Sequence, residues 1–142
     1  MTSGELYLLR HAEAAGDDDD DPGLSARGVS QARLVGARLS GTKAAALLHS
    51  PRRRAAQTAA IMAESLPGVP VSVSDLLEDR TPVPSSMRRN EYPQRHLPRL
   101  DETPPAERDV DAAALSQAVH ELAQEALRRA RDGPLFSSLT HS

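Results

Sequence analysis

The chain contains four short apolar runs, which are separated by longer segments with a helical repeat of apolar positions. A short apolar run bounded by turn residues is typical of a strand that is buried on both faces, as the strands of parallel sheets are. We therefore expect strands at residues 5–10, 44–49, 69–73 and 135–140.

Between these runs, apolar residues recur every three or four positions, which predicts helices with one buried face. The first helix is expected over residues 25–41, because Ser25 is a good N-cap, and the second over residues 51–66, because proline suits the first turn. A third is expected over residues 111–133. The apolar stripes are Gly28, Ala32, Val35 and Leu39 on the first helix, and Leu115, Ala118, Val119, Leu122 and Ala126 on the third.

The order of these elements predicts the fold class. Strands that alternate with helices form a mainly parallel sheet with right-handed crossovers, so we expect a three-layer α/β/α sandwich. At this length, residues 1–142 are expected to form a single domain. Residues 81–108 hold six prolines and several arginines, and we interpret them as a long Pro/Arg-rich loop that is either a substrate lid or a solvated connection.

Composition excludes several classes of protein. A net charge of −3 gives no general attraction to nucleic acid or to anionic lipid, so neither is expected as a partner. The absence of cysteine excludes a disulfide framework, a thiolate zinc site and a cysteine nucleophile. The N-terminal residues lack the pattern of a signal peptide, and no apolar run approaches the roughly 18 residues of a membrane span. We therefore expect a cytoplasmic location.

Polar residues suited to phosphate chemistry follow three of the predicted strands. Arg10 and His11 follow the first strand, three arginines lie within residues 50–54 after the second, and His141 follows the last. Ligands of parallel sheets bind beyond the carboxyl ends of the strands, so we expect these side chains to converge. A neutral imidazole is a nitrogen nucleophile, and guanidinium groups bind phosphate oxygens bidentately. This combination favours phosphoryl transfer that needs no metal and no other cofactor.

Three motifs, in this order and at this spacing, resemble those of the histidine phosphatase superfamily, the phosphoglycerate mutase-like enzymes. They are LRHAE at residues 9–13, LSARGVSQA at residues 24–32 and SPRRRAAQTA at residues 50–59. The resemblance covers residues 5–79 well and is weak over residues 80–134. It implies the phosphoglycerate mutase-like version of the α/β fold.

The resemblance also implies a role for each matching residue. His11 corresponds to the nucleophile that becomes phosphohistidine, and Arg10 and Arg54 correspond to the groups that bind the phosphoryl oxygens. Glu78 resembles the acid that protonates an alkoxide leaving group. His141 resembles the second histidine of the phosphate pocket, with a catalytic and a phosphate-binding role.

The function implied is that of a phosphatase, a hydrolase that cleaves phosphate monoesters or phosphoramidates through a phosphohistidine on His11. Its expected substrate is a small phosphorylated metabolite or a phosphoprotein. The alternatives are a protein phosphohistidine phosphatase, which can dispense with the acid Glu78, a phosphoglycerate mutase-type phosphotransferase and a degenerate, non-catalytic module that binds phospholigands. Hydrolysis is preferred to mutase activity, because a mutase normally needs a larger enclosing lid.

Two departures from the family pattern bear on these expectations. Ala12 stands where the family usually has glycine, which is a minor change. The chain ends at Ser142, whereas family members continue past the second histidine with a helix and usually a strand. A terminal carboxylate beside the pocket repels anions, so we expect impaired activity. An uncovered sheet edge or face would favour a homodimer.

The run of five aspartates at residues 17–21 lacks the spaced ligands, the glycine and the distal glutamate of a calcium loop. We interpret the run as a solvated acidic loop and expect no metal site. The remaining histidines are interpreted as bystanders: His49 at the end of a strand, His96 in the loop and His120 on a helix surface.

Overall fold

The computed structural model describes residues 4–16, 21–78 and 80–139. Its main sheet has the strand order β1-β6-β2-β3, and all three strand pairings are parallel. The strands are β1 (Leu6–Arg10), β2 (Ala46–His49), β3 (Val71–Val73) and β6 (Leu135–Leu139). The parallel sheet expected from the sequence is confirmed, and the last strand of the chain lies between the first two.

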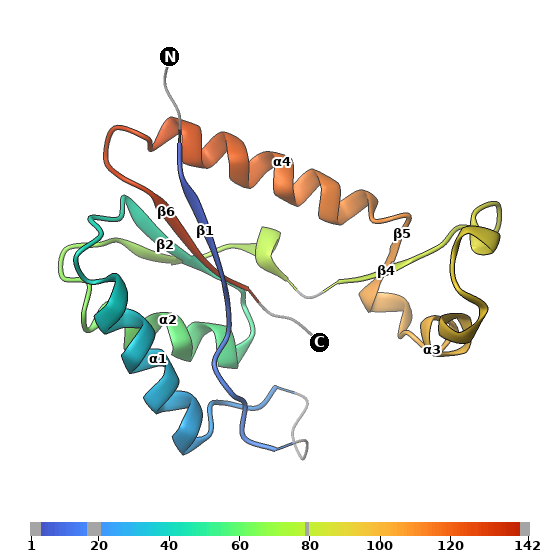
Figure 1. Ribbon diagram of the computed structural model, residues 1–142, viewed down its shortest axis with the longest axis horizontal. Helices are drawn as coiled ribbons and strands as arrows, with labels where there is room; N and C mark the ends of the chain where they lie inside the picture. Colours follow the sequence, from blue (N-terminus) through green and yellow to red (C-terminus); the bar gives the residue numbers. More distant parts are fainter. Residues whose placement is uncertain (1–3, 17–20, 79, 140–142) are drawn as a thin grey trace.

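Helices cover both faces of this sheet (Figure 1). On one face, α1 (Ala26–Leu39) and α2 (Arg53–Ala63) pack together, and Ala59 and Met62 of α2 pack against Leu47 and Phe136 of the sheet. On the other face lies α4 (Ala113–Arg128), whose buried Leu122 and Ala126 contact β2 and β6. The expected three-layer α/β/α fold is therefore confirmed.

The local signals place the ends of α1 well, whereas α4 ends at Arg128, five residues before the predicted end at 133, and α2 ends at Ala63, three residues before the predicted 66. The Ser25 side chain caps α1 by accepting a hydrogen bond from the Gly28 N–H at 3.0 Å, as the sequence predicts. Helix α2 begins later than expected: Arg52 is its N-cap, so Pro51 lies before the helix rather than in its first turn.

The apolar stripe predicted for α4 is buried only in part. Ala118, Leu122 and Ala126 are buried, whereas Leu115 is 44% exposed and Val119 is 53% exposed. The reason is the path of the helix: its N-terminal half extends past the sheet, so the inward face has nothing from the sheet beneath it there (Figure 1). None of the helices in the described part of the chain is long and apolar enough to span a membrane.

Residues 80–112 form an arm that projects away from the main sheet (Figure 1). Where the sequence predicts a long loop, the structure has the two parallel strands β4 (Thr81–Val83) and β5 (Arg108–Val110) and the short helix α3 (Leu97–Asp101). Single 3₁₀ turns complete the arm, at Arg89–Glu91, Gln94–His96 and Pro105–Glu107. A further such turn, η1 (Asp75–Leu77), joins the sheet to the arm.

Candidate active site

The candidate site lies at the carboxyl edge of the sheet, where β1 and β2 end and α2 begins. His11 directly follows β1, and residues 50–54 lead from β2 into α2. Ser50 is fully buried at this junction: its N–H donates to the Ser138 carbonyl of β6 at 3.1 Å, and its hydroxyl accepts from the Arg52 N–H at 3.1 Å. This turn fixes the start of α2, whose N-cap residue Arg52 makes no capping hydrogen bond through its side chain.

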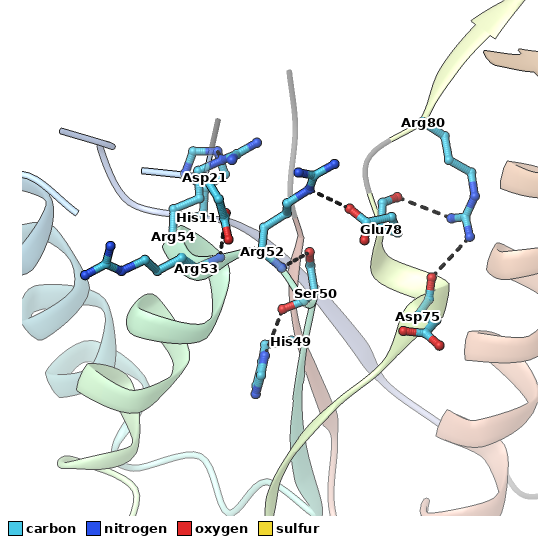
Figure 2. Close-up of polar contacts among 10 residues, drawn as sticks. All are labelled: His11, Asp21, His49, Ser50, Arg52, Arg53, Arg54, Asp75, Glu78 and Arg80. Atoms are coloured by element: carbon cyan, nitrogen blue, oxygen red, sulfur yellow. Dashed lines mark hydrogen bonds and ion pairs between the residues drawn. The ribbon is translucent and has the colours of Figure 1, made fainter. Parts of the chain in front are cut away.

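His11 and Arg54, which the sequence analysis expects to meet, are in contact (Figure 2). The Arg54 Nε–H donates to His11 Nε2 at 3.2 Å, and His11 Nδ1 lies 2.6 Å from the carbonyl oxygen of Ala12. Because a guanidinium can only donate, Nε2 must accept and so carries the lone pair. In the neutral ring the proton is therefore on Nδ1, which donates it to the Ala12 carbonyl. Nε2 is thus the ring nitrogen whose lone pair faces Arg54.

A threonine on α2 links the His11 loop to the helix that carries Arg54. The buried Thr58 hydroxyl accepts a hydrogen bond from the Ala12 N–H at 3.0 Å and donates to the Arg54 carbonyl at 2.8 Å. The loop and the first turn of α2 are thus held in fixed relation through one side chain. Thr58 was not among the site residues expected from the sequence, although its place one turn after Arg54, within a matched motif, was a usable signal.

Two glutamines hold the rest of the loop that follows His11. The Gln31 side chain on α1 accepts from the Glu13 N–H at 2.9 Å, and the Gln57 side chain on α2 accepts from the Leu24 N–H at 2.6 Å. Gly28 lets α1 approach this loop, since a Cβ added there would lie 2.1 Å from the Glu13 carbonyl oxygen. The second and third motifs therefore position the first one.

Arg10, the last residue of β1, is exposed and lies beside two cavities at this edge. Both cavities have Arg10, His11, Ala12 and Gln31 in their walls, and their volumes are about 300 and about 440 Å³. The smaller one is otherwise lined mainly by apolar side chains of β1, α1 and α2: Leu9, Ala32, Val35 and Met62. Arg10 and His11 therefore share the same hollow surface.

Glu78 lies on the other side of the α2 N-terminus and forms an ion pair with Arg52 (Figure 2). Arg52 is not among the site residues expected from the sequence. The Arg52 Nε–H donates to Glu78 Oε1 at 2.8 Å, and each side chain is about one third exposed. Arg80 donates to the carbonyls of Leu76 and Glu78 at 3.1 and 3.3 Å, and so holds the turn that carries the carboxylate.

Asp21 corrects part of the interpretation of the acidic run. Its carboxylate accepts a hydrogen bond from the Arg53 N–H at 2.9 Å, so it caps the N-terminus of α2 rather than being a purely solvated residue (Figure 2). A carboxylate at this end of a helix also complements the helix dipole. The aspartates at 17–20 lie outside the described residues.

The other candidates are placed as follows. His141 lies outside the described residues. His49 is half-buried at the end of β2, and its Nδ1 lies 2.9 Å from the Ser50 carbonyl oxygen. Within the described ranges, no group of three or more His, Cys, Asp or Glu residues is arranged to hold a metal ion.

Comparison with known proteins places this geometry in a family. A sequence model of the histidine phosphatase superfamily (branch 1) matches residues 6–135. The mouse mitochondrial serine/threonine-protein phosphatase PGAM5 is 35% identical over 82 residues, which are 55% of this chain and 28% of that protein. Its relative from Xenopus tropicalis is 38% identical over 82 residues, 55% of this chain and 30% of that protein. The matched segment thus spans less than a third of these curated relatives.

Solved structures show the same fold at low identity. A phosphoglycerate mutase from Bacillus anthracis gives a TM-score of 0.73 at 14% identity, covering 98% of this chain and 76% of that one. The protein histidine phosphatase SixA, solved with tungstate, gives a TM-score of 0.56 at 21% identity, covering 94% of this chain and 68% of that one. With its family model matched from β1 to the start of β6, the chain belongs to the histidine phosphatase superfamily.

Proposed function

We propose that this protein is a phosphatase that hydrolyses phosphate monoesters or phosphoramidates through a phosphohistidine intermediate on His11. The observation that carries the proposal is the contact between Arg54 Nε and His11 Nε2, with Nδ1 tied to the Ala12 carbonyl. This contact places a nucleophilic lone pair next to a permanent positive charge at the carboxyl edge of the sheet.

In the first step, His11 Nε2 forms a bond to phosphorus while the bond from phosphorus to the leaving group breaks. Arg54 and Arg10 bind the phosphoryl oxygens and offset the charge that spreads over them in the transition state. By resemblance to the family, we assign a phosphate-binding role to His141 as well, which lies outside the described residues. The Nδ1 hydrogen bond to the Ala12 carbonyl stabilises the imidazole as positive charge develops on it.

In the second step, water attacks the phosphohistidine and releases inorganic phosphate. The arm supports hydrolysis over mutase activity, because it projects away from the sheet rather than enclosing its carboxyl edge (Figure 1). A mutase has to retain its phosphorylated intermediate and reorient the substrate within an enclosed site.

The substrate class that we propose is a small phosphorylated metabolite or a phosphoprotein. Several arginines at the carboxyl edge supply positive charge that suits either one: Arg10, Arg52 and Arg54. The names of the relatives, a serine/threonine-protein phosphatase and a protein histidine phosphatase, support the phosphoprotein.

The test is covalent labelling of His11. Wild type and His11→Ala are incubated with p-nitrophenyl phosphate, quenched and analysed by intact mass and peptide mapping, with His120→Ala on the α4 surface as the matched control. We expect acid-labile phosphate on the peptide that contains His11 and nitrophenol release in wild type and control, and neither in His11→Ala. Bound substrate without transfer would instead identify a non-catalytic phospholigand-binding module.

We also propose that the reaction needs no metal ion and that the protein acts in the cytoplasm. Arg10 and Arg54 supply the charge that a metal would otherwise provide, and a chain without cysteine suits a reducing compartment. A rate that falls in excess EDTA would contradict the first proposal. Cell fractionation tests the second, since the PGAM5 relatives are named as mitochondrial proteins.

We propose, finally, that two copies associate. The edge strand β3 carries Val71 and Val73, which are 40% and 58% exposed, and Leu8 on the opposite edge strand β1 is 56% exposed. Exposed apolar edge strands favour pairing with another chain. Sedimentation equilibrium tests this proposal, and a monomer at all protein concentrations would reject it.

A further inference from the structure

The first turn of α2 presents two guanidinium groups to two different partners. Arg54 contacts His11, and Arg52, the N-cap residue, forms an ion pair with Glu78 at 2.8 Å (Figure 2). The residue that resembles the family's acid is therefore bound to a cation that belongs to the same helix turn as the phosphate-binding arginine.

Both ends of this ion pair are anchored by the backbone. The Arg52 N–H donates to the hydroxyl of the fully buried Ser50, which sets the position of Arg52. The turn before Glu78 is held by Arg80, which donates to carbonyl oxygens of residues 75, 76 and 78. The backbone turns that carry Arg52 and Glu78 are thus both held, and the ion pair joins their side chains.

The ion pair has a chemical consequence for an acid. Attraction to a guanidinium requires the ionised carboxylate, whereas donation to a leaving group requires the carboxylic acid. Glu78 therefore has to leave its ion pair with Arg52 before it can assist a leaving group.

We propose that Arg52 is a positioning and specificity-determining residue that holds the Glu78 side chain in an ion pair, so that the enzyme favours phosphoryl donors whose leaving groups need no proton. This inference rests on the proposed phosphatase function. The favoured donors are aryl phosphates and phosphoramidates protonated on nitrogen, and the disfavoured ones are alkyl phosphates.

The electron and proton balance separates these classes. In each case the bond between His11 Nε2 and phosphorus forms, and the leaving atom departs with the electron pair of its bond to phosphorus. A nitrophenolate is stable as the anion, and a protonated phosphoramidate nitrogen leaves as a neutral amine or imidazole. An alkoxide has to receive a proton, and Glu78 would be its source.

The experiment measures the ratio of kcat/KM for glycerol 2-phosphate to kcat/KM for p-nitrophenyl phosphate. The variants are Arg52→Gln, which removes the cation, Arg52→Lys, which keeps it, and Arg52→Gln combined with Glu78→Gln. Arg53→Gln is the matched control, because this neighbouring side chain is exposed and points away from Glu78 (Figure 2).

We expect Arg52→Gln to raise the ratio about two- to fivefold, which is the size of effect that a partly exposed ion pair supports. The rise should disappear in the double variant, and Arg52→Lys and Arg53→Gln should keep the wild-type ratio. A lower ratio in Arg52→Gln, or a rise that persists without Glu78, would overturn the proposal.

Failure of the inference is distinguishable from failure of the proposed function. If wild type labels His11 and releases nitrophenol but the ratio does not respond to Arg52→Gln, the phosphatase stands and the role of Arg52 is rejected. If wild type cleaves neither substrate and no phosphohistidine forms, the proposed function itself is rejected.

Discussion

The loop that carries His11 and the arm at residues 80–112 both lie outside the main sheet next to strand ends, and their side-chain contacts differ. The loop is held in part by hydrogen bonds to the buried Thr58 and the half-buried Gln57. Within the arm, exposed ion pairs join side chains outside the β4–β5 ladder: Arg88 with Glu91 and Arg89 with Asp101. Buried hydrogen bonds hold a group in one position, whereas exposed ion pairs are weak and are screened by salt. The site is therefore built on the rigid segment.

We expect the largest effect, a loss of kcat, from removing the positive charge next to His11. Replacement of Arg54 by alanine removes the guanidinium next to His11 Nε2. We expect kcat for p-nitrophenyl phosphate to fall by about 10²–10³-fold, the usual effect of losing one group that stabilises transition-state charge. Arg53→Ala, one residue earlier, serves as the control, and an equal loss in both variants would show that only the general charge of this turn matters.

A second prediction concerns the close approach of α1 to the loop. In Gly28→Ala the new methyl group would meet the Glu13 carbonyl oxygen, so we expect the free energy of unfolding to fall by about 1–3 kcal/mol. Gly41→Ala is the matched control, because no atom lies within 4 Å of a Cβ added there. Urea denaturation followed by circular dichroism measures both variants. Equal stability of the two would mean that the loop is free to move away from the helix.

The third prediction tests the hydroxyl that joins the loop to α2. Thr58→Val leaves the buried Ala12 N–H without its acceptor, which should cost about 1–3 kcal/mol in the free energy of unfolding and reduce kcat as well. Thr58→Ser keeps the hydroxyl and should restore the rate. If Val and Ser variants have the same kcat, the hydrogen bond does not position His11.

The smallest expected effect is on the stability of the arm, which should depend on pH. The hydrogen bond from Arg89 holds the pKa of Asp101 below its usual value, and the backbone N–H of Ser85 does the same for the pKa of Asp111. A lowered folded-state pKa contributes stability that is present above the unfolded value, about 3.9 for Asp, and is lost as pH falls through the folded one. Acidification below about pH 4 should therefore loosen the arm before the sheet.

Amide hydrogen exchange followed by NMR tests this order, with protection of β4 and β5 compared with that of β6 across the acid range. Asp111→Asn should weaken the pH dependence of protection in the arm, whereas Asp132→Asn, an exposed site outside it, should not. Simultaneous loss of protection in arm and sheet would contradict the contrast between the two regions.

Those parts of the molecule that depend on local chemistry or on topology were predictable from the sequence. Ser25 is an N-cap because of its side chain alone. The meeting of His11 with Arg54 follows from the rule that parallel strands end at one edge, although the residues lie 43 positions apart. Neither inference needed the exact path of a loop.

Other parts of the molecule depend on how helices and strands are placed in space. The repeat of apolar positions along the sequence does not show this placement. Leu115 and Val119 have helical spacing, yet they are exposed because α4 runs past the sheet at that point. The pairing of Arg52 with Glu78 depends on where the chain turns after β3. The strands of the arm have three residues each, too few for a repeat of apolar positions to be recognised.

The fully buried alanines of α2 have a consequence for how this protein can change. Ala55 and Ala59 are 0% exposed, so a bulkier side chain at either position would tilt the helix as one body. Such a tilt would also move the site residues that the helix carries: Arg52, Arg54 and Thr58. A single packing mutation at a distance from the site would thus disturb leaving-group protonation, phosphate binding and the positioning of His11 together. Kinetic measurements on a set of such variants would show these three properties changing in parallel.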